Sequence, residues 1–430
     1  MKYLLIILGL LFCNIKSFAQ TETEQVNNAV LQIKNKVIEW RRHFHQFPEL
    51  SNREFNTSKK VAEHLKNLGL EVRTGIAKTG VVGILKGGKP GPVVALRADM
   101  DALPVTERNN LPYKSTVTTT FNGQNTGVMH ACGHDAHTAM LMGAAEVLSK
   151  LKASVPGTVV FIFQPAEEGA PEGEEGGASL MVKEGVMDNP KVDVVFGMHI
   201  ESDIPAGDLE YKEGAFMASA DLFKIKVKGK SSHGSQPWLG VDPIYVSAQI
   251  INAFQGIVSR NSDLTKAPVV ITVAAIHSGL RFNIIPEEAE MLGTVRNLDK
   301  DIRIKVLEEL KAIAEGIAKL HHATAEVTIE NKTLVTYNTP QLVKKMLPSL
   351  EKAAGKNNVR SRTWVTGAED FSFYGEKAPA FFFYIGGMSA TIKSEQAAPH
   401  HTPDFIIDDS KLDVGVKALC QLVFDYSKVK

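Results

Sequence analysis

Two kinds of hydrophobic spacing run through the N-terminal half of this chain. Residues 26–47 and 57–68 carry apolar side chains three and four positions apart, which predicts two helices. Short continuous apolar runs, typical of strands buried on both faces, occupy residues 81–85, 93–96, 158–163 and 192–198. A turn at residues 87–92 joins the first two runs, and a helix is predicted over 136–148. Alternating helices and strands predict an α/β domain with a mostly parallel sheet.

The pattern changes near residue 214. Residues 222–227 alternate apolar side chains with lysines, as a half-exposed strand does. The predicted order from there to residue 329 is strand, helix, strand, strand, helix, strand, which is a ferredoxin-like α+β unit. We therefore interpret residues 214–332 as a domain inserted into the α/β domain, which comprises residues 20–213 and 333–430.

Composition and charge exclude several classes of protein. Lysine plus arginine and aspartate plus glutamate both total 48, so the formal net charge is zero. No basic patch indicates a nucleic-acid partner. The hydrophobic fraction of 44% and the charged fraction of 22% are those of a soluble globular protein.

Residues 1–19 have the pattern of a signal peptide. Lys2 supplies the positive start, residues 4–12 are apolar, and Ala19 ends a small-residue cleavage pattern. Asn14 and Lys16 interrupt the apolar stretch too early for a stable membrane span. The sequence therefore predicts export to a periplasm or to the medium.

The segment from Met129 to His137 reads Met-His-Ala-Cys-Gly-His-Asp-Ala-His. Cys132 and His134 flank Gly133, so a tight turn can aim sulfur and imidazole at one point. Both are ligands suited to zinc and its neighbours. Taken alone, the segment leaves open a solvated surface loop, or a nucleophilic Cys132 with His134 as its base.

Further metal-type side chains follow the predicted strands. Glu167 and Glu168 come after the run at 158–163, His199 ends the run at 192–198, and a histidine pair occupies positions 400 and 401. Each alone is typical of an ordinary surface or structural residue. Because the carboxyl ends of parallel strands meet at one edge of a sheet, together they predict a site for one or two divalent ions.

Several motifs occur in one order along the chain and together carry a family resemblance. They read Arg41-Arg-His-Phe-His-Gln-Phe-Pro-Glu49, Leu96-Arg-Ala-Asp-Met-Asp-Ala-Leu-Pro104, His130-Ala-Cys-Gly-His-Asp135, Gln164-Pro-Ala-Glu-Glu168, Ser232-His233, Phe282-Asn-Ile-Ile-Pro286 and Gly367-Ala-Glu-Asp-Phe371. From about residue 29 onward, the chain resembles the metal-dependent aminoacylase/carboxypeptidase superfamily. Within it, the chain is most similar to the amidohydrolase branch of hippurate hydrolases and plant auxin-conjugate hydrolases.

This resemblance implies a site for two divalent ions, zinc or manganese. The implied ligands are Cys132, His134, Glu168, His199 and His401. His400 is the alternative to His401. The peptidase branch has a histidine where this chain has Asp99, so Asp99 is not expected to be a ligand. Asp101 is expected to orient a ligand histidine.

The resemblance also implies roles for residues outside the ligand set. Glu167 is expected to act as general base. His233 is expected to reach in from the partner subunit of a homodimer formed through the inserted domain, and Asn283 to help hold the substrate. His130, Asp135 and His137 are expected to support ligands or to cap the following helix. Phe216, Met217, Trp238 and Phe371 are either pocket-lining or core residues.

The sequence therefore predicts an exported, metal-dependent amidohydrolase that cleaves the amide bond of N-acyl-L-amino acids. A dipeptidase or carboxypeptidase of the same superfamily is the alternative enzyme. From another class, the alternative is an inactive metal- or ligand-binding protein.

Overall fold

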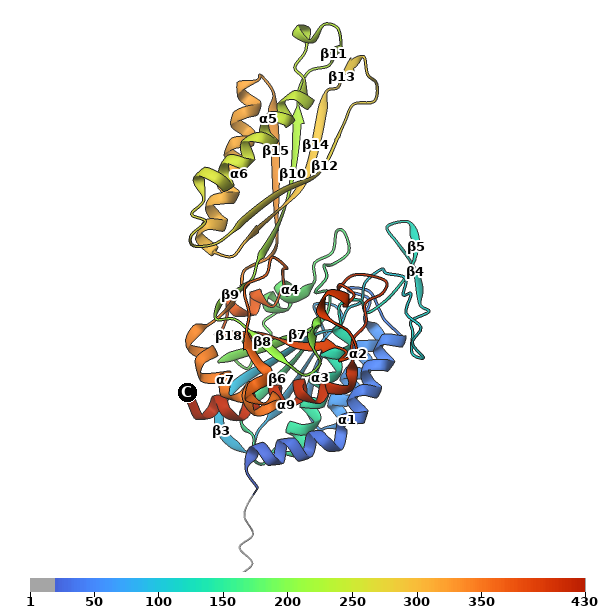
Figure 1. Ribbon diagram of the computed structural model, residues 1–430, viewed down its shortest axis with the longest axis vertical. Coiled ribbons are helices and arrows are strands. Elements are labelled where there is room, and N and C mark those ends of the chain that lie inside the picture. The colour runs from blue at the N-terminus through green and yellow to red at the C-terminus, as the bar shows by residue number, and fades with distance from the viewer. Residues whose placement is uncertain (1–19, 430) are drawn as a thin grey trace, which may run out of the picture.

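The computed structural model describes residues 20–429 and consists of two domains stacked along its longest axis (Figure 1). The signal peptide expected at residues 1–19 lies outside the described residues, so export remains a prediction. Within residues 20–429, no helix combines the length and the apolar character needed to cross a membrane.

An eight-stranded sheet forms the centre of the larger domain, in the order β1-β2-β6-β3-β7-β18-β8-β17. Its strands are β1 Glu71–Ile76, β2 Gly80–Lys86, β3 Lys89–Asp99, β6 Pro156–Gln164, β7 Val194–Pro205, β8 Leu209–Tyr211, β17 Val359–Ser361 and β18 Ala380–Met388. The four central strands β6, β3, β7 and β18 are parallel neighbours. Strands β1 and β2 pair antiparallel at one edge, and β8 is antiparallel to β18. The expected α/β fold is confirmed, with a mixed, mostly parallel sheet.

Helices cover both faces of this sheet, which explains the continuous apolar runs. One face packs against α1 Glu22–Gln46, α2 Phe55–Asn67, α3 His134–Lys150, α7 Pro340–Ala354 and α9 Leu412–Val429, and the other against the short helices α4 Gly177–Lys183 and α8 Ser372–Gly375. Successive side chains of a strand point to opposite faces. Accordingly, Phe381 and Phe383 lie in one core and Phe382 in the other.

The first two apolar runs follow one another along the chain but are not neighbours in the sheet, and the turn predicted at residues 87–92 is confined to residues 87 and 88, because β3 already begins at Lys89. Strand β6 lies between β2 and β3, antiparallel to the first and parallel to the second. The amide of Gly87 donates to the carbonyl of Gly157 at 2.8 Å, which ties the turn to the start of β6. This order puts the end of β6 beside the end of β3, and so brings Glu167 and Glu168 near Asp99 and Asp101.

The inserted domain is a four-stranded antiparallel sheet with two helices on one face. Its elements are β10 Ser219–Lys228, α5 Pro243–Gly256, β12 Val269–Ser278, β14 Glu288–Asn297, α6 Lys300–Leu320 and β15 Thr324–Thr333. The sheet order β12-β14-β10-β15 is that of a ferredoxin-like unit, as predicted. At its junction with the larger domain, β9 Gly214–Met217 pairs with β16 Thr336–Asn338.

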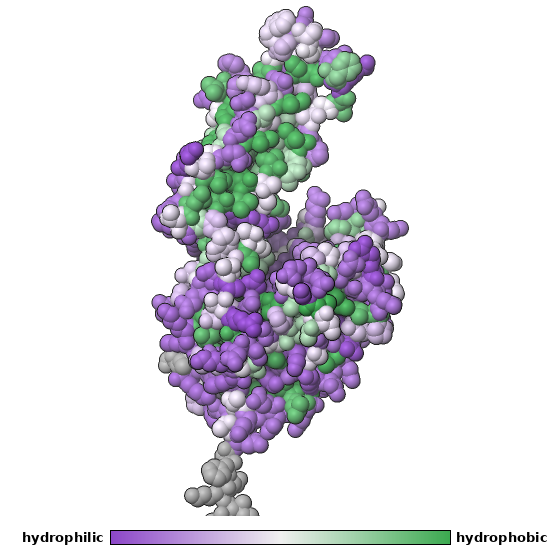
Figure 2. Space-filling view, viewed as in Figure 1, coloured by the Kyte–Doolittle hydropathy of each residue, from purple (hydrophilic) through white to green (hydrophobic). Residues whose placement is uncertain are grey.

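Two short segments stand at the outer end of the inserted domain. Strands β11 Ser232–His233 and β13 Ile284–Ile285 pair there, at the top of Figure 1 and far from the large sheet. In the larger domain, a hairpin of β4 Thr118–Phe121 and β5 Gln124–Gly127 also projects from the body. Between the two domains the surface is hollowed, as Figure 2 shows.

Candidate metal centre and active site

The carboxyl edge of the parallel strands brings most of the predicted site residues together. Asp99 ends β3, Glu167 and Glu168 follow β6, and His199 lies in β7. Cys132 stands just before α3, whose first residue is His134. The loop after β18 returns to the same edge and supplies His400 and His401.

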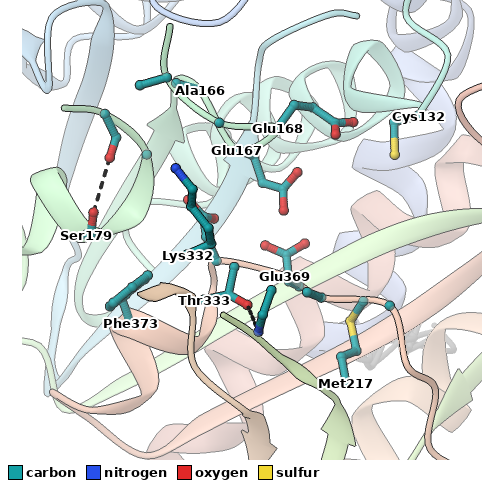
Figure 3. A pocket seen from close by; sticks show the side chains of 18 of the residues that line it. Cys132, Ala166, Glu167, Glu168, Ser179, Met217, Lys332, Thr333, Glu369 and Phe373 are labelled. Carbon is teal, nitrogen blue, oxygen red and sulfur yellow. Dashed lines mark hydrogen bonds between the residues drawn. The ribbon is translucent and has the colours of Figure 1, made fainter. Parts of the chain in front are cut away.

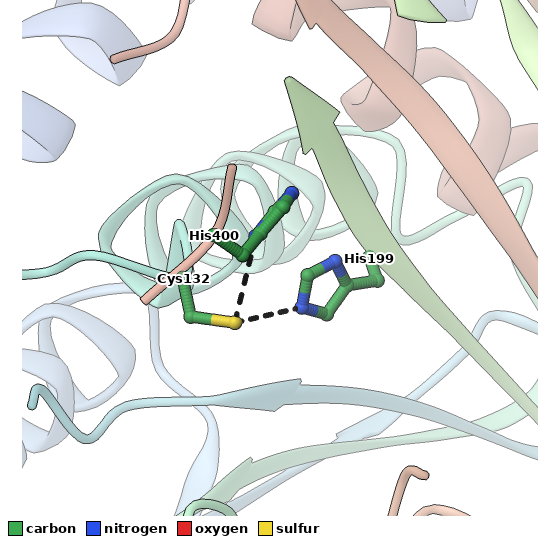
Figure 4. Close-up of side chains that lie close together, drawn as sticks. All are labelled: Cys132, His199 and His400. Carbon is green, nitrogen blue, oxygen red and sulfur yellow. Dashed lines mark hydrogen bonds between the residues drawn. The ribbon is translucent and has the colours of Figure 1, made fainter. Parts of the chain in front are cut away.

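The thiol of Cys132 is surrounded by three histidines. Its Sγ lies 3.3 Å from Nε2 of His199 and 3.6 Å from Nδ1 of His400, as Figure 4 shows. Nε2 of His401 is 3.3 Å from the same sulfur. Cys132 therefore belongs to two groups of metal-type side chains, one with His199 and His400 and the other with Glu168 and His401.

His401 makes a further contact that His400 does not. Its Nε2 lies 3.1 Å from Oε1 of Glu168, whereas Nε2 of His400 lies 3.4 Å from a carboxylate oxygen of Glu201. His401 also has a φ of 62°, in the left-handed region. That conformation costs a non-glycine residue about 1–3 kcal/mol, and such strain clusters at functional sites. Both histidines are placed to bind a metal ion, His400 with Cys132 and His199, and His401 with Cys132 and Glu168, so the choice of His401 stays a prediction.

The two glutamates lie near the Nε2 atom of the His134 ring. Nε2 of His134 is 3.9 Å from Oε2 of Glu167 and 3.9 Å from Oε1 of Glu168. This nitrogen is buried and has no hydrogen-bond partner among the described residues. Because an unpaired buried nitrogen is costly, a cation between these groups fits them well.

The electrostatics of the centre also call for positive charge. Burial alone lowers the pKa of His134, but Asp99, Asp101 and Glu168 outweigh it and raise the pKa to about 10. Burial, with Glu168 and Glu167, holds the pKa of the Cys132 thiol well above its usual range. A divalent cation would offset the carboxylates and favour the thiolate, so the donor set suits a metal ion.

Asp101 organises this half of the centre. Its Oδ1 lies 3.3 Å from Nδ1 of His134 and accepts the amide of Glu167 at 3.1 Å. Its Oδ2 accepts the amide of Glu168 at 3.0 Å and the hydroxyl of Ser51 at 2.7 Å. A single buried carboxylate therefore orients the histidine ring and the turn that carries both glutamates.

A second buried carboxylate fixes the residue before that pair. Ala166 has a φ of 52°, and its amide donates to Oε1 of Glu54 at 2.9 Å. The other oxygen of Glu54 accepts the hydroxyl of Thr79 at 2.5 Å. Burial and the nearby Asp101 raise the pKa of Glu54 to about 7.

Asp99 is occupied by other partners. Its Oδ2 accepts Arg97 Nη1 at 2.6 Å, and its Oδ1 lies 2.6 Å from Nδ1 of His137. His137 Nε2 in turn accepts the amide of Ile200 at 2.7 Å, next to His199. Asp99 therefore already has an arginine and a histidine as partners, although it also lies with His134 and His137 in a group that could hold a metal ion, so its exclusion from the ligands stays a prediction. His137 links Asp99 to the strand of His199.

The remaining residues of the Cys/His segment differ in their surroundings. Asp135 lies 2.8 Å from Nε of Arg41 and 2.9 Å from Nδ1 of His45, all three being buried. It therefore ties the start of α3 to α1. His130 is buried, and neither ring nitrogen has a hydrogen-bond partner among residues 20–429; the structure gives no account of its role.

The two residues predicted from the inserted domain lie away from the centre of their own chain. His233 is in β11, and the amide of the next residue donates to the carbonyl of Asn283 at 2.9 Å, so the two are neighbours. Both stand at the outer end of the inserted domain, and neither lines the cavity of the centre.

A cavity of about 1070 Å³ opens over the centre. Cys132, Glu167, Glu168 and Met217 line it, as do side chains of the inserted domain such as Lys332 (Figure 3). Of the four apolar candidates, only Met217 lines this cavity. Phe216 and Phe371 are core residues, and Trp238 is 74% exposed on the inserted domain.

Sequence reasoning missed three groups near the centre. Arg97 lies in the motif that begins at Leu96, Glu369 in the motif that begins at Gly367, and Glu54 shortly after the motif that ends at Glu49, but none of the three had a predicted role. Arg97 is fully buried and contacts Asp99, Glu369 and Asp370. A buried arginine in a strand is the signal that several carboxylates meet there, because burying its charge requires such partners.

Residues 95–425 match the model of peptidase family M20/M25/M40. The chain belongs to this family. It is 43% identical to thermostable carboxypeptidase 1 of Saccharolobus solfataricus over 406 residues, which cover 94% of this chain and 98% of that protein. It is 42% identical to an N-acyl-L-amino acid amidohydrolase of Geobacillus stearothermophilus over 303 residues, covering 70% and 78% of the two chains.

A solved structure supports the same assignment. The crystal structure of the Bacillus subtilis YXEP protein, a dinuclear metal binding peptidase of the M20 family, is 36% identical and superimposes with a TM-score of 0.75. The match covers 93% of this chain and all of that one. The M20 chain described here is thus a hydrolase of amide or peptide bonds.

Proposed function

We propose that this M20 hydrolase cleaves the amide bond of N-acyl-L-amino acids with two divalent ions, zinc or manganese, per subunit. The observation that carries the proposal is the position of Glu167. Its carboxylate lies 3.9 Å from the unpaired Nε2 of His134, on the wall of the cavity and beside the candidate ligand Glu168. A base at the edge of a metal centre is what hydrolysis of an unactivated amide requires.

The candidate ligands are Cys132, His134, Glu168, His199 and His401. When bound, the ions would supply positive charge that polarises the acyl carbonyl and eases deprotonation of water. Glu167 takes a proton from the attacking water and returns it to the nitrogen of the leaving amine. Asp101 keeps His134 and the amides of both glutamates in place for this work.

Positively charged side chains around the cavity support a substrate that releases an amino acid. Arg296 and Lys332 of the inserted domain and Arg362 of the larger domain line the cavity. Their positive charge suits the free carboxylate of an N-acyl amino acid. The same charge suits the C-terminus of a peptide, and the 43% identity to a carboxypeptidase favours that enzyme as the second candidate.

Dimerisation is a further part of the proposal. His233 stands far from the centre of its own chain, so we propose that it serves the site of a partner subunit and stabilises the oxyanion there. Large apolar side chains of the inserted domain are exposed, among them Ile244, Tyr245, Ile276, Leu280 and Phe282. Such exposure on one domain is typical of an interaction surface.

The test of activity is a substrate panel on metal-reconstituted protein. N-acetyl and N-benzoyl amino acids are compared with dipeptides and longer peptides at matched concentration. Amidohydrolase activity predicts a higher kcat/KM on the acyl amino acids. Glu167→Gln is expected to keep its metal content and to lose about 10²–10⁴-fold in kcat. Metal binding with no turnover on any substrate would favour the binding-protein alternative, and a preference for peptides would favour the carboxypeptidase.

The dimer is tested by mixing two inactive variants. Glu167→Gln and His233→Ala chains are unfolded and refolded together. If His233 serves the partner's site, half of the dimers are mixed and each has one complete site, so activity returns to about a quarter of the wild-type value. No recovery on mixing, or an active His233→Ala protein, would contradict the shared site.

Export is proposed from residues 1–19 alone. The protein recovered from the medium or the periplasm is expected to begin at Gln20, as checked by N-terminal sequencing.

A further inference from the structure

One carboxylate in the cavity has no part in the mechanism described above. Glu369 lies on the segment before α8 and is 1% exposed. Figure 3 shows its carboxyl group facing that of Glu167 across the cavity. Both residues line the cavity, and a carboxylate oxygen of each lies within 4.8 Å of the other.

Glu369 is held rigidly from behind. Its Oε1 lies 2.9 Å from Nη2 of the fully buried Arg97 and accepts the amide of Phe371 at 2.9 Å. Both contacts are to the same oxygen. The hydrogen bond and the ion pair of the Glu369 carboxylate among the described residues both use Oε1, and Figure 3 shows the carboxyl group directed into the cavity. An acceptor is therefore fixed in position beside the general base.

The neighbouring acid is already satisfied. Oδ1 of Asp370 lies 2.8 Å from Nη2 of Arg97 and accepts the side-chain amide of Gln164 at 2.7 Å. Its Oδ2 accepts the backbone amide of Ala178 at 2.7 Å and the side-chain amide of Gln164 at 2.8 Å. Asp370 thus has no free oxygen, and it accounts for the buried charge of Arg97 together with Asp99. A purely structural partner for Arg97 does not explain why Glu369 leaves one oxygen toward Glu167.

The two carboxylates lie close enough for one amine nitrogen to contact both. A tetrahedral nitrogen that donates two hydrogen bonds of about 2.9 Å places the two acceptors about 4.7 Å apart. Oxygens of Glu167 and Glu369 that lie within 4.8 Å can therefore hold one nitrogen between them. The nitrogen in this reaction that acquires such hydrogens is that of the leaving amine.

We propose that Glu369 accepts the N–H of the scissile amide and then of the departing amine, while Glu167 delivers the proton. This role rests on the proposed amide hydrolysis. Water forms the new C–O bond, the C–N bond breaks with its electron pair going to nitrogen, and the proton that Glu167 took from water ends on that nitrogen. Glu369 gains and loses no proton. It accepts an N–H of the leaving nitrogen as the C–N bond breaks, and it attracts the ammonium that forms when the amine takes up the remaining proton of the new carboxylic acid.

The test compares an amide with its ester. Glu369→Gln keeps an oxygen for Arg97 and Phe371, which turns the amide NH₂ toward the substrate nitrogen, donor against donor. With an N-acyl amino acid, kcat/KM is expected to fall about 10- to 100-fold. With the O-acyl ester of the matching α-hydroxy acid, whose leaving atom carries no hydrogen, kcat/KM is expected to change less than threefold.

Two controls separate this role from others. Glu330→Gln removes a charge from a carboxylate of the inserted domain that lines the same cavity and is paired with Lys332. It is expected to leave the amide-to-ester ratio unchanged. Glu167→Gln is expected to lose both activities. A wild-type protein that cleaves neither substrate refutes the proposed function itself, whereas an unchanged amide-to-ester ratio in an active Glu369→Gln refutes only the role of Glu369.

A second measurement uses the wild-type protein alone. The product amino acid, as its ammonium form, is expected to inhibit at least tenfold more strongly than the α-hydroxy acid of the same side chain, because only the former meets both carboxylates. Equal inhibition by the two compounds would overturn the proposal. So would loss of one bound metal equivalent in Glu369→Gln, which would assign this carboxylate to a cation instead.

Discussion

Replacing Asp101 by asparagine tests the idea that one buried carboxylate assembles half of the metal centre. In the wild-type protein it faces four groups, the Nδ1 of His134, the amides of Glu167 and Glu168, and the hydroxyl of Ser51. Asparagine keeps one oxygen and turns two hydrogens toward the other pair. In either orientation, one of the two backbone amides loses its acceptor.

The size of the effect follows from these contacts. A buried N–H without a partner costs about 1–3 kcal/mol, so the apoprotein is expected to lose about 1–3 kcal/mol in free energy of unfolding. If the NH₂ faces His134, the ring is driven to the tautomer with its hydrogen on Nε2, which is the atom offered to metal. Disturbed support of this kind typically costs 10–100-fold in metal affinity, or about 1.4–2.8 kcal/mol.

Both quantities are measurable on the same protein. Urea unfolding after treatment with a chelator gives the first, and competition with a zinc-binding dye gives the second. Asp203→Asn, at an exposed position of β7, serves as a matched control and is expected to change neither. The reasoning would be refuted if the free energy of unfolding of Asp101→Asn lay within about 0.5 kcal/mol of the wild-type value and its metal affinity within about twofold, both about the size of measurement error.

Three other outcomes are expected from the same contacts. Glu54→Ala removes the acceptor of the Ala166 amide and is expected to lower kcat about tenfold with little change in KM, because the left-handed turn before Glu167 loosens. Glu54→Gln keeps an acceptor and is expected to retain most of the wild-type kcat. Equal losses of kcat in the two variants would show that this hydrogen bond does not control turnover. Cys132→Ser is expected to lower the metal content measured by elemental analysis, since a hydroxyl replaces the thiolate; full occupancy would exclude Cys132 as a ligand. Burial acts to raise the pKa of Asp135, but Arg41 and His45 hold it far below its usual value, so its stabilisation is present above the unfolded pKa of about 3.9 and is lost as the pH falls through the folded value. The difference in Tm between the chelator-treated wild type and Asp135→Asn is therefore expected to narrow on acidification, and a constant or widening gap would contradict that sign.

Local patterns along the chain were enough for much of the architecture. Helix α1 follows the apolar spacing of its sequence and begins at a capping box of Thr21 and Glu24. The fold of the inserted domain could be predicted from the order of its elements, because strand, helix, strand, strand, helix, strand is the order of a known motif. Spacing within a few residues dictates such features, so sequence periodicity predicts them well.

Strand partners in the large sheet depended on the tertiary structure. The turn at residues 87–92 indicated two connected strands, yet β6 lies between them. Pairing β6 with both β2 and β3 brings together segments far apart along the chain, and no local pattern records that choice. The same choice decides which strand ends share an edge, and hence where Glu167 meets His134.

The sequence by itself determined which side chains are available to the centre: a Cys/His turn, a glutamate pair, a strand-end histidine and a histidine pair, in the order typical of M20 hydrolases. Only the tertiary structure decided how they are held. Arg97 directs Glu369 toward Glu167, Glu54 fixes the strained Ala166, and Asp101 binds one ring and two amides at once. The reason is physical, because a buried charge is tolerated only where its partners converge, and that convergence is created by folding rather than by spacing along the chain.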